Sequence, residues 1–204
     1  MEKWLGPESK FFKYGTILCD LIILTIIWSL VSLPIFTIGT ATSALYYVTT
    51  RQLSDREGYV TRDFFKSFKQ NFITGTILTI IFAICAAILF FNITMTYGTL
   101  FFYLSIVVAY EVIATAMYSF PVLSRFDLKA MEVLKNSFFM ANKHIFTTLS
   151  CFALIFIMFF ICRQWPFLFI VCIGLYCFIS SFFFMIVFRK YVPEMDKDIE
   201  DEFE

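Results

Sequence analysis

Residues Phe72–Phe91 read FITGTILTIIFAICAAILFF, a run of twenty residues without one charged side chain. A helix of this length rises about 1.5 Å per residue, enough to cross the roughly 30 Å hydrocarbon core of a bilayer. Hydrocarbon offers no water to the backbone N–H and C=O groups, so such a run must be helical. Four more apolar blocks are Thr16–Phe36, Thr99–Val122, Ile145–Cys162 and Phe167–Phe188.

The composition of the whole chain also points to a membrane. Apolar residues make up 60% of the 204 residues, 29 residues are Phe, and the mean hydropathy is +0.80. A soluble domain of this size could not bury so much apolar surface. The blocks are apolar all round, whereas transmembrane β-strands alternate apolar and polar residues. We therefore predict an all-α, polytopic transmembrane helical bundle, with one transmembrane domain (residues 1–192) and an acidic cytoplasmic tail (residues 193–204).

A weaker sixth segment is Gly39–Thr50, which reads GTATSALYYVTT. Pro34 and Gly39 bracket a turn just before it. Gly39 and Ser43 are four residues apart, and Ala44 belongs to a second row of small side chains. Small residues in such rows let a neighbouring helix approach closely, so we expect helix packing here. The alternative is a re-entrant or interfacial segment that does not cross the membrane.

The Lys and Arg residues favour a full crossing. With six helices in three hairpins and both termini in the cytoplasm, 15 of the 16 Lys and Arg residues lie on the cytoplasmic side. Only Arg163 faces outwards, which agrees with the positive-inside rule. A re-entrant segment would instead place Lys3, Lys10 and Lys13 outside. A cleaved signal peptide is disfavoured, because no A-x-A site follows the first apolar run.

A basic segment with helical periodicity precedes the second hairpin. In Thr61–Phe72, all four Phe side chains fall on one side of a helix, and Arg62 and Lys66 fall on the other. This pattern predicts an amphipathic helix at the cytoplasmic membrane surface. Such a helix could bind anionic lipid or dock a partner protein. We assign to a partner interface Phe64, Phe65, Phe68, Lys69, Asn71 and, from the next basic segment, Asn136 and Asn142.

The second basic segment precedes the third hairpin and has the same character. We predict Asp127 as its N-cap, since Asp accepts hydrogen bonds from the first helical N–H groups. Lys129, Glu132 and Lys135 form the polar face. The segment is again predicted to be an amphipathic interfacial helix on the cytoplasmic side. Its expected apolar face contains Leu128, Met131, Leu134, Phe138, Ala141 and Ile145.

Two acidic residues lie inside the apolar blocks and are candidate polar sites. Asp20 is close enough to the start of its helix to reach the cytoplasmic interface. Glu111 lies near the middle of Thr99–Val122 with no Lys or Arg at the same depth. A carboxyl group at this depth is expected to be neutral, or hydrogen-bonded to Tyr, Ser or Thr of another helix. The alternatives are a helix-packing role and an ion or proton pathway.

The motifs of common enzymes are missing from the sequence. It contains no G-x-S-x-G, no phosphate-binding loop and no H-E-x-x-H. His144 is the single His, and the six Cys residues are expected to act as small apolar side chains. We therefore expect no catalytic residue, no metal site, no cofactor and no nucleic-acid partner.

Several short stretches together resemble the YesL-like family of bacterial integral membrane proteins. The resemblance covers most of the chain, and its first half is the more specific. In the second half it rests on a general pattern. The stretches are Thr37–Ala41, Ala44–Val48, Arg56–Gly58, Phe64–Phe72, Pro121–Phe126, Lys135–Ser137 and Ala141–Asn142, with Pro34 and Tyr118.

The resemblance implies a role but no mechanism. Members of this family have no established activity and often lie beside genes for carbohydrate ABC importers. It thus implies a multi-pass protein of a bacterial plasma membrane, acting as a non-enzymatic accessory subunit in oligo- or polysaccharide uptake. The implied partners are membrane lipid and the permease subunits of such an importer. The alternative from the residues alone is a small secondary transporter or channel that uses Glu111.

Overall fold

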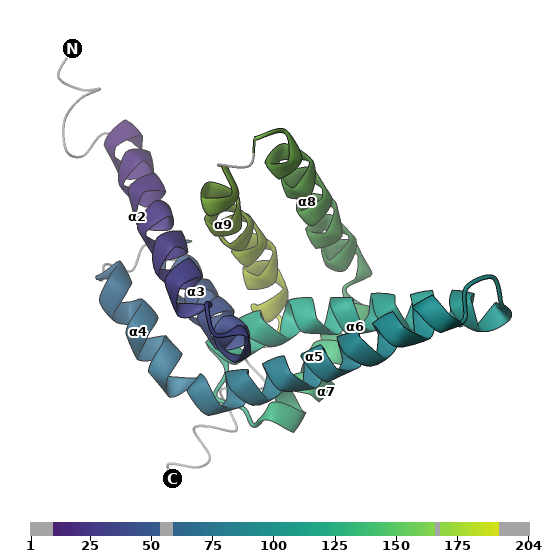
Figure 1. Ribbon diagram of the computed structural model, residues 1–204. Helices are drawn as coiled ribbons and strands as arrows, with labels where there is room; N and C mark the ends of the chain where they lie inside the picture. Colours follow the sequence, from purple (N-terminus) through teal and green to yellow (C-terminus); the bar gives the residue numbers. More distant parts are fainter. Residues whose placement is uncertain (1–9, 54–58, 166–167, 192–204) are drawn as a thin grey trace, which may run out of the picture.

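The computed structural model describes residues 10–53, 59–165 and 168–191, and all regular elements in these ranges are helices. The all-α fold class is therefore confirmed. The predicted acidic tail, residues 193–204, lies outside the described residues. In chain order the elements are α2 (Lys10–Val31), the 3₁₀ turn η1 (Ile35–Thr37), α3 (Ile38–Leu53), α4 (Val60–Gln70), α5 (Phe72–Met95), α6 (Leu100–Arg125), α7 (Ala130–Lys143), α8 (Ile145–Gln164) and α9 (Phe169–Phe188) (Figure 1).

Four of the described helices are long and apolar enough to cross a membrane. They are α5, α6, α8 and the Val171–Phe188 part of α9. The apolar part of α2, Gly15–Val31, is shorter. These helices have the character predicted for a membrane protein. Figure 1 shows α5 and α6 as a hairpin that runs across the direction of α2, α8 and α9. The arrangement as three hairpins stays a prediction.

Helix α3 lies at the centre of the fold, although it is only mildly apolar. It packs against α2, α4, α5, α6 and α9. Ser43 and Ala44 are completely buried on it. At Gly39 two neighbouring helices, α5 and α6, come so close that an added Cβ atom would clash with the side chains of Thr79 and Phe120. Small residues thus permit the close packing that holds the centre together.

Hydroxyl groups connect α3 to α9 inside the bundle. The oxygens of Tyr46 and Ser180 are 3.0 Å apart, and those of Thr49 and Ser181 are 2.8 Å apart. All four side chains are buried. Each pair satisfies polar atoms that would otherwise be stranded away from water, so the contacts stabilise this helix pair and fix its register.

The connection between α2 and α3 is a tight turn around Pro34. Helix α2 ends at Val31, before the predicted boundary at Phe36. The residue before a proline is driven out of the helical conformation, and Pro34 itself is extended at φ −73°, ψ 114°. The Thr37 hydroxyl donates a hydrogen bond shared between the carbonyls of Val31 and Pro34, both 2.6 Å away. It thereby satisfies a carbonyl group that the helix end leaves free.

Helix α7 begins later than predicted, and Asp127 is not its N-cap. The helix starts at Ala130, with Lys129 in the N-cap position. The backbone N–H of Lys129 donates to Glu132 Oε2 at 2.9 Å. A carboxylate three residues into a helix can satisfy the N-cap in this way, and it also lies favourably at the positive end of the helix dipole.

The buried face of α7 matches the predicted apolar face only in part, since Ala141 is buried and Leu128 and Leu134 pack against the core. Met131 and Phe138 are mainly exposed, with 76% and 52% of their surfaces accessible. Helix α7 has its most extensive contacts with α6. A helix that packs on another inside a membrane can turn its large apolar residues towards lipid. The residues actually buried are Val133, Ser137, Met140 and Ala141.

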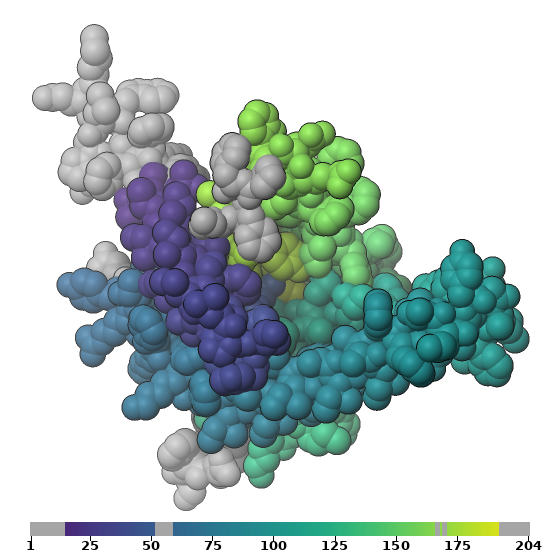
Figure 2. Space-filling view, viewed as in Figure 1, coloured from purple at the N-terminus to yellow at the C-terminus, as the bar shows by residue number. Residues whose placement is uncertain are grey.

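The far end of the α5–α6 hairpin projects from the rest of the molecule (Figure 2). Gly98 forms the turn with φ +81°, a conformation that other residues rarely adopt. The Tyr97 and Phe102 rings meet edge to face across it, with centroids 5.3 Å apart. Around this turn the large apolar side chains are mainly exposed, among them Phe90, Phe91, Phe101 and Leu104.

Candidate functional site

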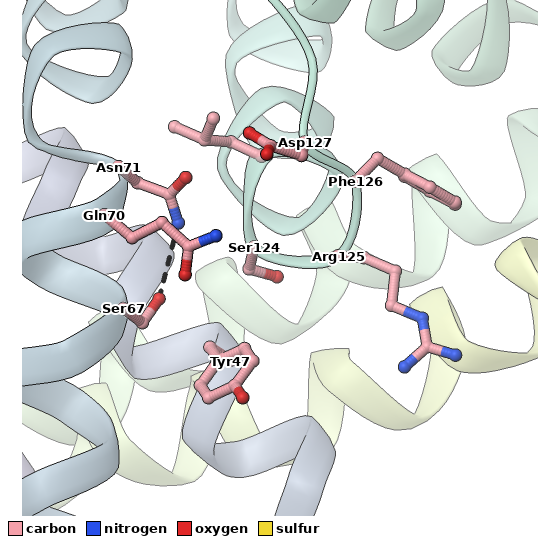
Figure 3. Close-up of a pocket in the computed structure, with 9 residues that line it drawn as sticks. Tyr47, Ser67, Gln70, Asn71, Ser124, Arg125, Phe126 and Asp127 are labelled. Atoms are coloured by element: carbon pink, nitrogen blue, oxygen red, sulfur yellow. Dashed lines mark hydrogen bonds between the residues drawn. The ribbon is translucent and has the colours of Figure 1, made fainter. Parts of the chain in front are cut away.

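A polar pocket of about 200 Å³ lies where α3, the junction of α4 with α5, and the end of α6 come together. Figure 3 shows side chains from these three regions surrounding it. The lining residues come from both halves of the chain, including the stretches that carry the family resemblance. They are Tyr47, Ser67, Gln70, Asn71, Leu123, Ser124, Arg125, Phe126 and Asp127.

The α4 side of the pocket is formed by a break between two helices. Asn71 has φ −95° and ψ 10°, so α4 ends at Gln70 and α5 begins at Phe72. The backbone N–H of Asn71 still donates to the Ser67 carbonyl at 3.0 Å. Its side-chain amide donates to the Ser67 hydroxyl at 3.4 Å (Figure 3). Both side chains are buried, so the break presents a fixed amide and hydroxyl to the pocket.

The α6 side is formed by the end of a helix that contains a proline. Pro121 has no N–H and cannot donate within the helix. The Ser124 hydroxyl donates to the Pro121 carbonyl at 2.7 Å. Phe126 then becomes extended, at φ −119° and ψ 136°, and ends the helix. The chain therefore turns beside the pocket, and Asp127 lies at its exposed rim.

The pocket is polar without a concentrated charge. Arg125 is exposed, and its guanidinium points away from the other lining groups (Figure 3). An ion pair joins Arg51 to Asp63 at 2.8 Å and links α3 to α4. Among the described residues, no group of three His, Cys, Asp or Glu side chains is placed to hold a metal ion. The chemistry offered is hydrogen bonding by amide, hydroxyl and carboxylate groups to a polar group of a ligand or partner.

The predicted interface residues on α4 divide between core and surface. Phe64 is completely buried and Phe68 packs against the core, with their rings stacked 6.3 Å apart. Phe65 and Lys69 remain on the surface, and 51% of the Phe65 surface is accessible. Phe64 and the buried Asn71 are thus occupied by contacts within the chain. The role of this helix in partner binding stays a prediction.

The predicted polar residues inside the spans lie apart from the pocket. Glu111 accepts a hydrogen bond at 3.0 Å from the side-chain amide of Asn142. The partner is therefore an amide at the end of α7, whereas we expected Tyr, Ser or Thr. Asn136 is half-buried one and a half turns earlier on α7, and Asp20 is half-buried on α2.

The sequence missed Tyr47 and Ser124 as pocket residues, because neither carries a recognisable motif.

The geometry defines an all-α protein with membrane-spanning character and a polar pocket between its two sequence halves. Residues 21–93 match the family model "Protein of unknown function, DUF624". The Bacillus subtilis (strain 168) protein "Uncharacterized protein YesL" is 30% identical over 141 residues, covering 65% of this chain and 66% of that protein. "Uncharacterized protein YteU" of the same organism is 23% identical over 168 residues, covering 79% of this chain and 76% of that one.

The chain belongs to the YesL-like family. The match to YesL spans slightly less than two thirds of the length of that protein. No solved structure matches this chain significantly. The family model ends within α5, so the α6 side of the pocket lies beyond the matched region.

Proposed function

We propose that this protein is a non-enzymatic accessory subunit that associates with the permease subunits of an ABC importer for complex carbohydrates. The importer is the partner that the family resemblance implies. The observation that carries an interaction role is the surface at the α4–α5 corner. There the exposed Phe65 and Lys69 lie on the same helix as the polar pocket residues Ser67 and Gln70.

Such a surface suits a protein contact more than catalysis. Phe65 offers apolar area and is held by edge-to-face packing on Phe64, with ring centroids 5.7 Å apart. Because Phe64 is fixed in the core, little side-chain freedom remains to be lost when Phe65 is covered. Further along the same helix, the pocket at Ser67 and Gln70 supplies donors and acceptors that can fix orientation. An apolar anchor beside polar groups is a common arrangement in protein interfaces.

We further propose that α2, α3, α5, α6, α8 and α9 cross a bacterial plasma membrane as three hairpins. Helix α4 then lies on the cytoplasmic side, α7 begins there and folds back along α6 as far as Glu111, and both termini are cytoplasmic. The distribution of Lys and Arg supports this topology. In a protein whose native Cys residues have been replaced, an impermeant thiol reagent on intact cells should label Thr96→Cys. Labelling of Ser54→Cys or Glu200→Cys would contradict the topology.

Co-purification tests the importer association. The protein is expected to co-purify in mild detergent with the permease subunits, and its deletion should impair growth on a complex glycan more than on the matching monosaccharide. Phe65→Asp should reduce the co-purified permease, because a charge would enter an apolar contact. Phe68→Asp should do so too, but it would also disturb the core.

A matched control separates docking from a general effect of charge. Phe138 on α7 is as exposed as Phe65, at 52% against 51%. Phe138→Asp should therefore leave the association intact if α4 provides the apolar anchor. Equal co-purification of folded wild type and Phe65→Asp would remove the basis for docking through α4.

The hydrogen bond between Glu111 and Asn142 supports a second candidate, a small transporter or channel. Glu111 lies in the middle of α6, where a carboxyl group is costly unless it has a use. Glu111→Gln keeps the size and an acceptor for the Asn142 amide, so folding should be unaffected. If purified wild type conducts ions or moves a solute in liposomes and Glu111→Gln does not, the transporter replaces the accessory subunit.

A further inference from the structure

Helices α8 and α9 each bring a cysteine to one shared cavity. The cavity is almost wholly apolar, has a volume of about 250 Å³, and lies between the two helices. Cys162 and Cys172 both line it, together with Phe159 and Tyr176. Cys162 lies in the last turn of α8 and Cys172 in the first turn of α9. The two thiols therefore occupy corresponding positions on either side of the connection between the helices.

The two side chains are near neighbours as well as sharing a cavity. The Cys172 thiol lies close enough to Cys162 for a side-chain hydrogen bond between them. Both cysteines are free thiols, and Cys172 has only 7% of its surface accessible. Two cysteines on facing ends of an antiparallel helix pair can be joined with little movement of the backbone, provided that their Cβ atoms point towards each other.

We propose that Cys162 and Cys172 form a reversible disulfide that closes this end of the α8–α9 hairpin. The two thiols lose two protons and two electrons as one S–S bond forms. A disulfide-bearing thiol oxidant receives the electrons and is reduced to its own pair of thiols. This inference rests on the proposed topology, in which this end of the hairpin faces the oxidising exterior where disulfides persist.

The bond would fix a helix that has few other contacts. Helix α8 packs mainly against α9, and against α7 where the two helices adjoin. Many of its large side chains are exposed, including Phe156 at 69% and Phe160 at 60%. A covalent link at the end away from α7 holds α8 on α9 and keeps the cavity between them at a constant width. The disulfide would thus supply a restraint that side-chain packing does not.

Thiol accounting in the full-length protein tests the proposal. The test variant keeps Cys162 and Cys172 and has the other four cysteines replaced by Ser. Membranes from aerobically grown cells are dissolved in denaturing detergent with N-ethylmaleimide, then reduced, and then treated with a polyethylene-glycol maleimide that shifts the band on a gel. The expected result is a shift by two tags that depends on reduction. The single variants Cys162→Ser and Cys172→Ser should show no such shift, because N-ethylmaleimide blocks their one thiol first.

Added oxidant and a topology marker separate the two ways in which the test could fail. If the band of the two-cysteine variant shows no reduction-dependent shift even after treatment of the membranes with diamide, the two thiols cannot meet and the disulfide is refuted. If diamide produces the bond but cells do not, the reversible disulfide in the cell is likewise refuted, although the geometry stands. Labelling of Thr96→Cys on intact cells then shows whether the topology is at fault.

Discussion

Helix α3 and the projecting end of the α5–α6 hairpin reverse the usual relation between polarity and burial. Helix α3 carries Thr, Ser and Gly residues, yet it is enclosed by five other helices. The hairpin end carries many large apolar side chains, yet Phe90 and Phe101 are 75% and 66% exposed. Water as the solvent would favour the opposite arrangement. The difference is the one expected if lipid surrounds the hairpin, and it teaches that close packing, not hydrophobicity, places α3 inside.

The physical reason lies in what each helix gains from its neighbours. Lipid chains are as apolar as Leu or Phe, so the hairpin end gains little by burying its side chains. Helix α3 gains dispersion contacts wherever Gly39, Ser43 and Ala44 let another helix approach. It also gains hydrogen bonds through Tyr46 and Thr49, which lipid could not provide. Helix α3 is less apolar than α2, α5, α6, α8 and α9, and among these helices it therefore has the strongest reason to be central.

The largest expected effect comes from removing apolar volume at the centre. Leu45 on α3 is completely buried, whereas 75% of the Phe90 surface is accessible. Leu45→Ala should lower the free energy of unfolding by about 2–5 kcal/mol, the usual cost of a core cavity. Phe90→Ala should change it by less than about 0.5 kcal/mol, although it removes more atoms. Denaturation in mixed micelles measures both, and equal losses would mean that the hairpin end is packed in the native protein.

A slightly smaller effect is expected from adding volume at the same two places. Gly39→Val puts atoms where Thr79 and Phe120 already lie, and overpacking of this kind costs about 1–3 kcal/mol. Ala87→Val on α5 is the matched control, because Ala87 is exposed. Thermal denaturation in detergent should show a lower midpoint for Gly39→Val only. An unchanged midpoint for that variant would show that α3 and α5 are not in close contact.

The sequence predicted the apolar helices well, because a helix that crosses a membrane requires a long run of apolar residues. Phe72–Phe91 lies within α5, and Thr99–Val122 corresponds closely to α6. The sequence could not place α3 at the centre, because a mildly apolar stretch with small residues fits both a buried helix and a re-entrant segment. The predicted apolar face of α7 was wrong for Met131, Phe138 and Ile145, which are exposed. Periodicity identifies an apolar face, but it does not reveal whether that face meets protein or lipid.

The candidate site was only partly accessible to prediction. Asn71 drew attention because it follows the Phe-rich basic segment, and it does line the pocket. Tyr47, Ser124 and Phe126 line it too, although they are distant in the sequence and carry no motif of their own. Their meeting depends on how α3 and α6 cross, which is decided by packing around Gly39. The hydrogen bond between Glu111 and Asn142 depends in the same way on α7 folding back along α6.

A modest effect is expected from removing one hydroxyl at the centre. Tyr46→Phe deletes the hydrogen bond to Ser180 and keeps the ring, including its edge-to-face contact with Phe184 at 5.8 Å. The loss should be about 0.5–2 kcal/mol, the range for hydrogen bonds between membrane helices. Tyr103→Phe on the exposed part of α6 should have no effect. The Tyr46→Phe, Ser180→Ala double-mutant cycle then measures the coupling, and a value near zero would assign the stability of this pair to packing alone.

The smallest expected effect is a change of stability with pH. It concerns His144, which lies between α7 and α8, and not the hydroxyl groups that join α3 to α9. Around His144 the charged and titratable groups are Lys143, Lys190 and Tyr191, and the ring nitrogen Nε2 lies 3.0 Å from the Tyr191 hydroxyl. Burial, followed by repulsion from Lys190 and Lys143, lowers the pKa of His144 below its ordinary value of 6.5. The folded protein therefore binds this proton less readily than the unfolded chain does.

The sign of the pH dependence follows from that lowered pKa. The stability contributed by neutral His144 is fully present above pH 6.5 and is lost as the pH falls towards the folded-state pKa. Thermal midpoints measured between about pH 5 and pH 8 should thus decline on the acid side. His144→Gln keeps a hydrogen-bonding group near Tyr191 but cannot titrate, so its midpoint should decline less. The centre of the bundle holds α3 to α9 through uncharged hydroxyls. The loss of stability in Tyr46→Phe should therefore be the same across this pH range. A profile for His144→Gln that is as steep as that of the wild type would place the acid-sensitive group elsewhere in the chain.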